Sequence, residues 1–173
     1  ATISTGQTLC ATFTVPAGAK QLRAQLFNSE TGGGAATDLD LLLVRAGAIV
    51  ASSGGVTSDE RVVLDNPVAA SNYQVCADGY NVPGGPQAFT INLWIVPATV
   101  TPKTLNAFGP AQVVTGGVAS VGVSWNVVAG ARYLGVVEHR QTAGGAVIGM
   151  SSVFVDTVPP VPAAPLVGDK PVR

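Results

Sequence analysis

Residues 37–53, TDLDLLLVRAGAIVASS, contain two apolar segments joined by a short turn. Leu39–Val44 is a continuous apolar run, and Ala48–Ser52 follows it across Ala46 and Gly47. Short apolar runs of this length, bounded by turn residues, are typical of β-strands. The stretch therefore predicts a β-hairpin.

Segments on either side of this hairpin alternate apolar and polar residues, as strands with one buried face do. In Leu9–Val15 every second residue is apolar, and Leu22–Leu26 repeats the pattern. No window holds a helical apolar period for three turns, and 21 glycines and 12 prolines interrupt the chain. Short strands with turns between them predict an all-β, jelly-roll-like β-sandwich. Further strands are expected at Arg61–Leu64, Tyr73–Asp78 and Ala88–Val96.

The character of the sequence changes near Pro97, where an extended Thr- and Pro-bearing linker is expected over residues 97–102. The following segment holds only four or five expected strands, so we expect it to pack against the first unit. The last residues are Pro-rich and predict an extended tail or linker. We therefore divide the chain into a β-sandwich over 1–97, a smaller β unit over 98–157 and a tail over 158–173.

Composition excludes several classes of function. Only 11% of the residues are charged and the formal net charge is −1, so neither a basic groove for nucleic acid nor a polybasic membrane patch is expected. No apolar run reaches the roughly 18 residues of a membrane helix. His139 is the single histidine, flanked by Glu138 and Arg140, and we expect it at a solvated strand edge. Without a catalytic or zinc-binding motif, we expect no enzymatic activity from this chain.

Cys10 and Cys76 both fall in the polar phase of their expected strands. A reduced cysteine usually behaves as a small buried hydrophobe, so outward placement of both favours a disulfide between them. Two unrelated free thiols remain the alternative. A disulfide would close a loop of more than 60 residues, could add roughly 4 kcal/mol of stability, and would place the protein in an oxidising compartment.

The first unit carries an ordered set of blocks that resembles the bacterial pre-peptidase C-terminal domain, a jelly-roll-like β-sandwich appended to secreted peptidases. The blocks are VPAG (15–18), TDLDLLLV (37–44), ASS (51–53), ERVVLDNP (60–67), YQVCADGY (73–80) and FTINLW (89–94). The segment SVGVSWNVVAGARYLGVVEH (120–139) resembles the small immunoglobulin- or fibronectin-like unit that follows this domain in some subtilisin-like proteases.

The resemblance implies a non-catalytic C-terminal accessory region of a secreted bacterial subtilisin-like serine protease, which binds or positions protein substrate. Its partners would be its own catalytic domain or an insoluble protein, and we expect a monomer. One alternative is an intramolecular chaperone or secretion element removed by cleavage in 97–102 or 158–165. Others are a carbohydrate-binding module, which needs two or three exposed aromatic residues in line, and a spacer without a ligand.

Asp38 and Asp40 flank Leu39 and are expected on one side of a strand. Their carboxylates could bind calcium with loop carbonyls and Asp78; the alternative is that they cap loop amides and pair with an arginine. Candidates for that pairing are Arg45 and Arg23. No other cofactor is expected.

Tyr80 and Trp94 are the candidate substrate-binding residues. Tyr80 is expected in an exposed loop after Cys76. Trp94 lies in the outer phase of the last strand of the first unit, where it could stack on a substrate or anchor the second unit. The linker follows directly, so the anchor is favoured. Trp125 shares a strand face with valines and is expected in the core of the second unit.

Overall fold

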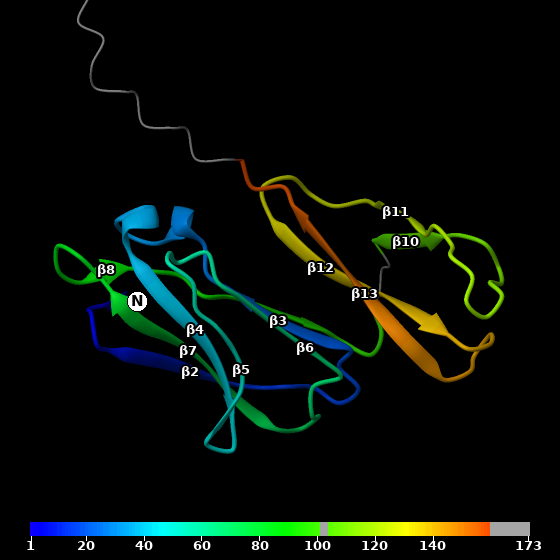
Figure 1. Ribbon diagram of the computed structural model, residues 1–173, viewed down its shortest axis with the longest axis horizontal. Helices are drawn as coiled ribbons and strands as arrows, with labels where there is room; N and C mark the ends of the chain where they lie inside the picture. The colour runs from blue at the N-terminus through cyan, green and yellow to red at the C-terminus, as the bar shows by residue number, and fades with distance from the viewer. Residues whose placement is uncertain (101–103, 160–173) are drawn as a thin grey trace, which may run out of the picture.

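The computed structural model describes residues 1–100 and 104–159, and there the chain is an all-β protein (Figure 1). Two antiparallel sheets pack face to face in the first unit, which confirms the expected β-sandwich. One sheet has four strands, in the order β2 (Thr8–Thr14), β7 (Asn72–Asn81), β4 (Asp38–Arg45) and β5 (Ala48–Ser53). The other has three, in the order β6 (Arg61–Asp65), β3 (Gln21–Gln25) and β9 (Asn92–Val96).

The hairpin of β4 and β5 forms where the sequence predicts it. Ala46 and Gly47 connect the strands with φ of 51° and 79°, the left-handed conformations that a tight two-residue hairpin turn requires. On β4 the side chains of Leu39, Leu41 and Leu43 are fully buried between the sheets. The hairpin therefore contributes the centre of the core, which also holds Ile3, Val15, Leu22, Leu26 and Tyr73.

Short elements close the ends of the sandwich. β1 (Thr2–Ile3) pairs with β8 (Gln87–Ala88), so the expected strand Ala88–Val96 is divided into β8 and β9. The expected loop after β3 contains two 3₁₀ turns, Asn28–Glu30 and Gly34–Ala36.

The second unit consists of two hairpins, β10 (Leu105–Phe108) with β11 (Gly122–Trp125) and β12 (Arg132–Arg140) with β13 (Val147–Asp156). Strand β10 was not predicted. Leu105 packs on Gly135, where a Cβ atom would lie 2.6 Å from the leucine side chain. The prediction that Trp125 lies in a core is wrong: the residue is 49% exposed, because two hairpins supply too few strands to enclose it.

The hairpin of β12 and β13 lies on the outer face of the three-stranded sheet as a further layer (Figure 1). β12 contacts β9, and β13 contacts β3 through Ser152 and Phe154. Residues 101–103 of the predicted linker and 160–173 of the predicted tail lie outside the described residues. In the part of the chain that is described, no helix has the length and apolarity that a membrane crossing requires.

Candidate functional site

The two outer faces of the sandwich differ in what lies on them. The outer face of the three-stranded sheet is covered by the second unit, and even its polar residues Gln21 and Arg23 are buried. On the four-stranded sheet the outer face remains open within the described residues, and the side chains of β2 are largely exposed. This open face is the candidate binding surface.

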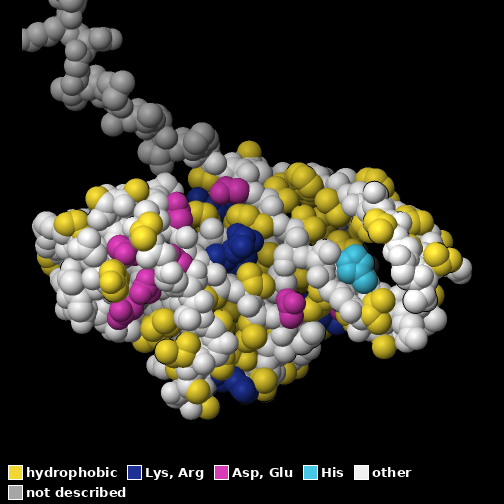
Figure 2. Space-filling model, in the orientation of Figure 1, with side chains coloured by type: hydrophobic (Ala, Val, Ile, Leu, Met, Phe, Trp, Pro, Cys, Tyr) yellow, Lys and Arg dark blue, Asp and Glu magenta, His cyan; other side chains and the backbone are white. Residues whose placement is uncertain are grey.

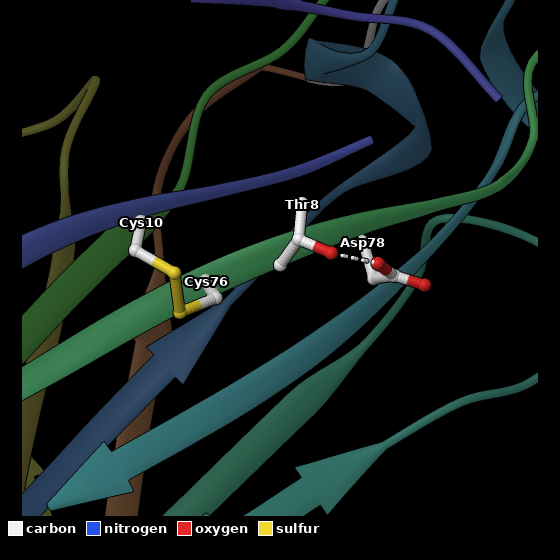
Figure 3. Close-up of a disulfide and its surroundings, with 4 residues drawn as sticks. All are labelled: Thr8, Cys10, Cys76 and Asp78. Carbon is white, nitrogen blue, oxygen red and sulfur yellow. Dashed lines mark hydrogen bonds between the residues drawn. A yellow bond between two sulfur atoms is a disulfide. The ribbon is translucent and has the colours of Figure 1, made fainter. Parts of the chain in front are cut away.

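A disulfide joins Cys10 of β2 to Cys76 of β7 on this open face (Figure 3). The two residues are direct cross-strand partners, with Cα atoms 4.0 Å apart. Thr8 and Asp78 form the neighbouring pair on the same face, and the threonine hydroxyl donates a hydrogen bond to the carboxylate. The disulfide links positions 66 residues apart, and in the chain-entropy account it stabilises the fold by roughly 4 kcal/mol. It fixes β2, which among the described strands is paired along one edge only.

Acidic side chains gather at one end of the four-stranded sheet, and Figure 2 shows several on the surface of the first unit. Asp40 and Asp78 oppose each other on neighbouring strands. Burial raises the pKa of the Asp40 carboxyl, and the negative charges of Asp38, Glu60 and Asp78 raise it further. No cation of the described residues forms an ion pair with these carboxylates, and their mutual repulsion favours uptake of a proton by Asp40.

The expected pairing of Asp38 and Asp40 with an arginine does not occur within the described residues. Arg45 lies over the ring of Tyr73, 6.0 Å from its centre, and Arg23 donates to the side chain of Gln25. The prediction failed because both arginines extend over aromatic rings instead.

Calcium at Asp38 and Asp40 stays a prediction. Asp38 is 7% exposed, and its Oδ1 has no hydrogen-bond partner in the structure. Yet no three acidic, histidine or cysteine side chains of the described residues are grouped so that they could hold a metal ion. The carboxylates alone therefore do not form a ligand set, since calcium takes six to eight oxygen ligands.

Tyr80 is the exposed aromatic residue of the open face. It lies near the end of β7 rather than in a loop as expected, and 68% of its surface is accessible. The register between β4 and β7 shifts here, so that Tyr80 stands in a β-bulge two residues after Asp78. Tyr80 therefore presents its ring to solvent beside the acidic group.

Trp94 lies under the second unit instead of in solvent. Its ring meets the ring of Phe154 edge-on, with centroids 5.3 Å apart, and its Nε1 donates to the carbonyl oxygen of Arg132 at 3.2 Å. The guanidinium group of Arg23 stacks on the ring of Phe154, 3.7 Å from its centre. The geometry is that of an anchor between the units, and it leaves Trp94 little surface for a substrate.

Charged residues complete this junction, and sequence reasoning missed them. Arg132 of β12 forms ion pairs with Glu30 of the first unit and with Asp156 of β13. Burial alone would lower the pKa of Arg132, but its hydrogen bonds to both carboxylates outweigh burial and raise it. Burial and the charge of Arg61 lower the pKa of Arg23 to about 10. Both guanidinium groups thus stay charged at neutral pH.

His139 lies at the exposed end of β12, and its Nε2 is 2.9 Å from the hydroxyl of Ser151. The neighbouring Glu138 is engaged by Lys20 and Arg140, and no described carboxylate holds the other ring nitrogen in place. Nucleophilic catalysis needs such an orienting group and a site that excludes water. The pair lacks both within the described part of the chain.

No known protein family matches the chain, and no curated protein sequence matches it. The resemblance to the pre-peptidase C-terminal domain therefore stays a prediction from the sequence blocks.

Proposed function

We propose that this chain is a non-catalytic accessory region of a secreted bacterial subtilisin-like protease, and that it binds or positions protein substrate through the open face of the four-stranded sheet. The observation that carries the proposal is the contrast between the two outer faces: one is buried under the second unit, and the other presents Tyr80, the threonines of β2 and Cys10 to solvent. The cross-strand disulfide supports an oxidising compartment.

The chemistry of the open face suits a protein surface without a strong negative charge. Thr8, Thr12 and Thr14 lie at alternate positions of β2, and their side chains are exposed. Tyr80 adds a ring with a hydroxyl, a combination enriched where proteins bind one another. Because lysine and arginine are few, attraction to polyanions contributes little.

A carbohydrate-binding module is less well supported. Stacking on a glycan chain needs several exposed aromatic residues in line on one surface. Tyr80 lies on the first unit, whereas the exposed Phe108 and Trp125 belong to the second unit. The described residues thus offer one ring on the open face.

Co-sedimentation with insoluble collagen, keratin and elastin tests the proposal, with cellulose and chitin as comparison solids. We expect saturable retention on at least one protein fibre, and a loss of retention in Tyr80→Ala. Phe108→Ala is the matched control, because it removes an equally exposed ring from the second unit. Retention on no protein fibre would overturn the proposal and favour the chaperone or secretion element.

A further inference from the structure

Strand β13 has a long edge that no described element covers. It pairs with β12 along one side, and no described backbone group hydrogen-bonds to its other side between Val147 and Val155. This segment, VIGMSSVFV, contains no charged residue and no proline. Natural sheet edges usually carry such residues to prevent pairing with other chains. The edge is therefore open to an additional strand.

The three-stranded sheet provides a surface beneath that additional strand. β13 lies over β3, where Ser152 contacts Gln21 and Phe154 contacts Arg23. On the next strand, β6, Asp65 and Val63 are the direct partners of Gln21 and Arg23 and share their face. Val63 is 39% exposed. The second unit thus covers β3 and β9 but leaves β6 open.

The hairpin of β12 and β13 ends above β3, and the surface drops there to the exposed strand β6. A hollow lies at this step between β13 and β6. It has a volume of about 250 Å³ and is lined by Asp65 and Asn66 at the end of β6 and by Val147–Met150 of β13. Ile148, which stands at the register shift between β12 and β13, lines the hollow and is 69% exposed. The hollow has an apolar wall and a row of unpaired backbone donors and acceptors along one side.

We propose that the free edge of β13 binds an extended polypeptide segment of another protein by strand addition, with the segment lying over β6. Backbone groups of β13 would pair with the backbone of the segment, and alternate side chains of the segment would contact Val63 and Ile148. Arg61 and Asp65 flank Val63 on the same face, so an apolar side chain between two polar ones fits. This deepens the proposed function, on which it rests for the choice of a protein ligand.

A second copy of this chain fits the step less well than a free segment. β13 of a second copy already packs on its own β3 through Ser152 and Phe154, so that face is not available to lie on β6 of the first copy. A segment with both faces free meets no such obstacle.

Amide hydrogen exchange along β13, followed by NMR, tests the proposal. In the free protein we expect slow exchange at the residues that pair with β12 and fast exchange at the alternate residues. Reduced, carboxymethylated α-lactalbumin serves as a permanently unfolded polypeptide probe. At a probe concentration about ten times the dissociation constant, exchange at the fast positions should slow by about tenfold. The free edge of β2 is the internal comparison and should gain no protection.

Two variants separate the proposed site from general adhesion. Val63→Lys places a flexible charged side chain on the step and should abolish the added protection, while the pairing of β13 with β12 persists. Val118→Lys makes the same change at a residue that is 99% exposed elsewhere in the second unit, and should bind the probe as the parent does. Equal loss in both variants, or protection at β2 instead of β13, overturns the proposal.

The oligomeric state and fibre binding complete the test. Protection of β13 that rises with protein concentration in the absence of probe, together with a dimer in analytical ultracentrifugation, would assign the edge to a second copy and overturn the proposal. If fibre retention survives while the probe leaves β13 unprotected, strand addition is wrong and the proposed function stands. If β13 gains protection but no fibre is retained, strand addition stands and the open-face function is wrong.

Discussion

The two units of the molecule differ in how they are stabilised. In the first unit, Leu39, Leu41 and Leu43 are completely buried between two sheets, and a disulfide fixes an edge strand. In the second unit no side chain between 104 and 159 is fully buried. Its contacts with the first unit are aromatic, hydrogen-bonded and ionic instead. The first unit therefore carries its own core, whereas the second is ordered by the sheet on which it lies.

The largest expected effect comes from separating the units. Residues 104–159 alone should show no cooperative unfolding transition, because two hairpins without a buried core bury too little apolar surface. Residues 1–100 should unfold cooperatively in urea, followed by circular dichroism. A sharp transition in the isolated second unit would show that this unit folds without the sheet on which it lies.

Removing a core side chain should affect the first unit far more than the second. Leu41→Ala deletes a fully buried side chain of β4 and should lower the free energy of unfolding by about 2–5 kcal/mol. Leu105→Ala removes the same atoms from a half-buried site over Gly135 and should cost less than about 2 kcal/mol. Urea unfolding of both variants in the full chain measures the difference; equal losses would show that the second unit has a core of its own.

The junction should respond to loss of its aromatic anchor. Trp94→Ala removes the edge-on contact with Phe154 and the donor to the Arg132 carbonyl, and we expect a loss of about 2 kcal/mol for this half-buried ring. Hydrogen exchange should accelerate in β12 and β13 and stay unchanged in β4 and β7. Uniform acceleration through both units would instead assign Trp94 to the common core.

Most of the fold of the first unit follows from local sequence pattern. Alternation predicts which face of a strand is buried, and Leu22 and Leu26 lie in the core as it predicts. It also predicts that Cys10 and Cys76 lie on the outer faces of their strands, and these strands are neighbours in the sheet. In the second unit the same reasoning failed for Trp125, because a face with apolar side chains is buried only where another layer covers it. Periodicity therefore predicts which face of a strand is apolar, but not whether another layer of the fold covers that face.

The junction depends on contacts that no local pattern encodes. Glu30 and Arg132 are 102 residues apart, and neither stands in a motif. The alternation around Trp94, and the linker that follows it, indicated an anchor, but its partner Phe154 was not predictable. Asp38 and Asp40 lie on β4 as predicted, whereas the absence of a cationic partner for them among the described residues depends on the direction that the side chains of Arg23 and Arg45 take in the folded chain.

The smallest expected effect concerns two carboxylates in different environments. Asp40 lies at the acidic end of the open sheet, and Asp156 lies on β13 of the second unit. The pKa of Asp40 in the folded protein is raised above 3.8 by burial and then by Asp38, Glu60 and Asp78. The folded state therefore holds the proton of Asp40 more tightly than the unfolded state does. Its contribution to stability is lost as pH rises through the interval between 3.8 and the raised pKa, and it stays constant above that interval.

Asp40→Asn removes this loss, so the variant should be more stable than the parent at neutral pH by about 0.5 kcal/mol, and the gain should vanish in acid. Asp156→Asn is the control of opposite sign. Burial raises the pKa of Asp156, but hydrogen bonds from Arg132 and the Val158 amide outweigh it and lower the pKa. Its replacement should therefore destabilise the protein at neutral pH and have no effect in acid. Thermal unfolding of the parent and both variants at several pH values measures how each melting temperature changes with pH. The series is run in EDTA and again in excess calcium chloride. If calcium raises the melting temperature of the parent but not of Asp40→Asn, the carboxylates hold a cation rather than a proton on Asp40.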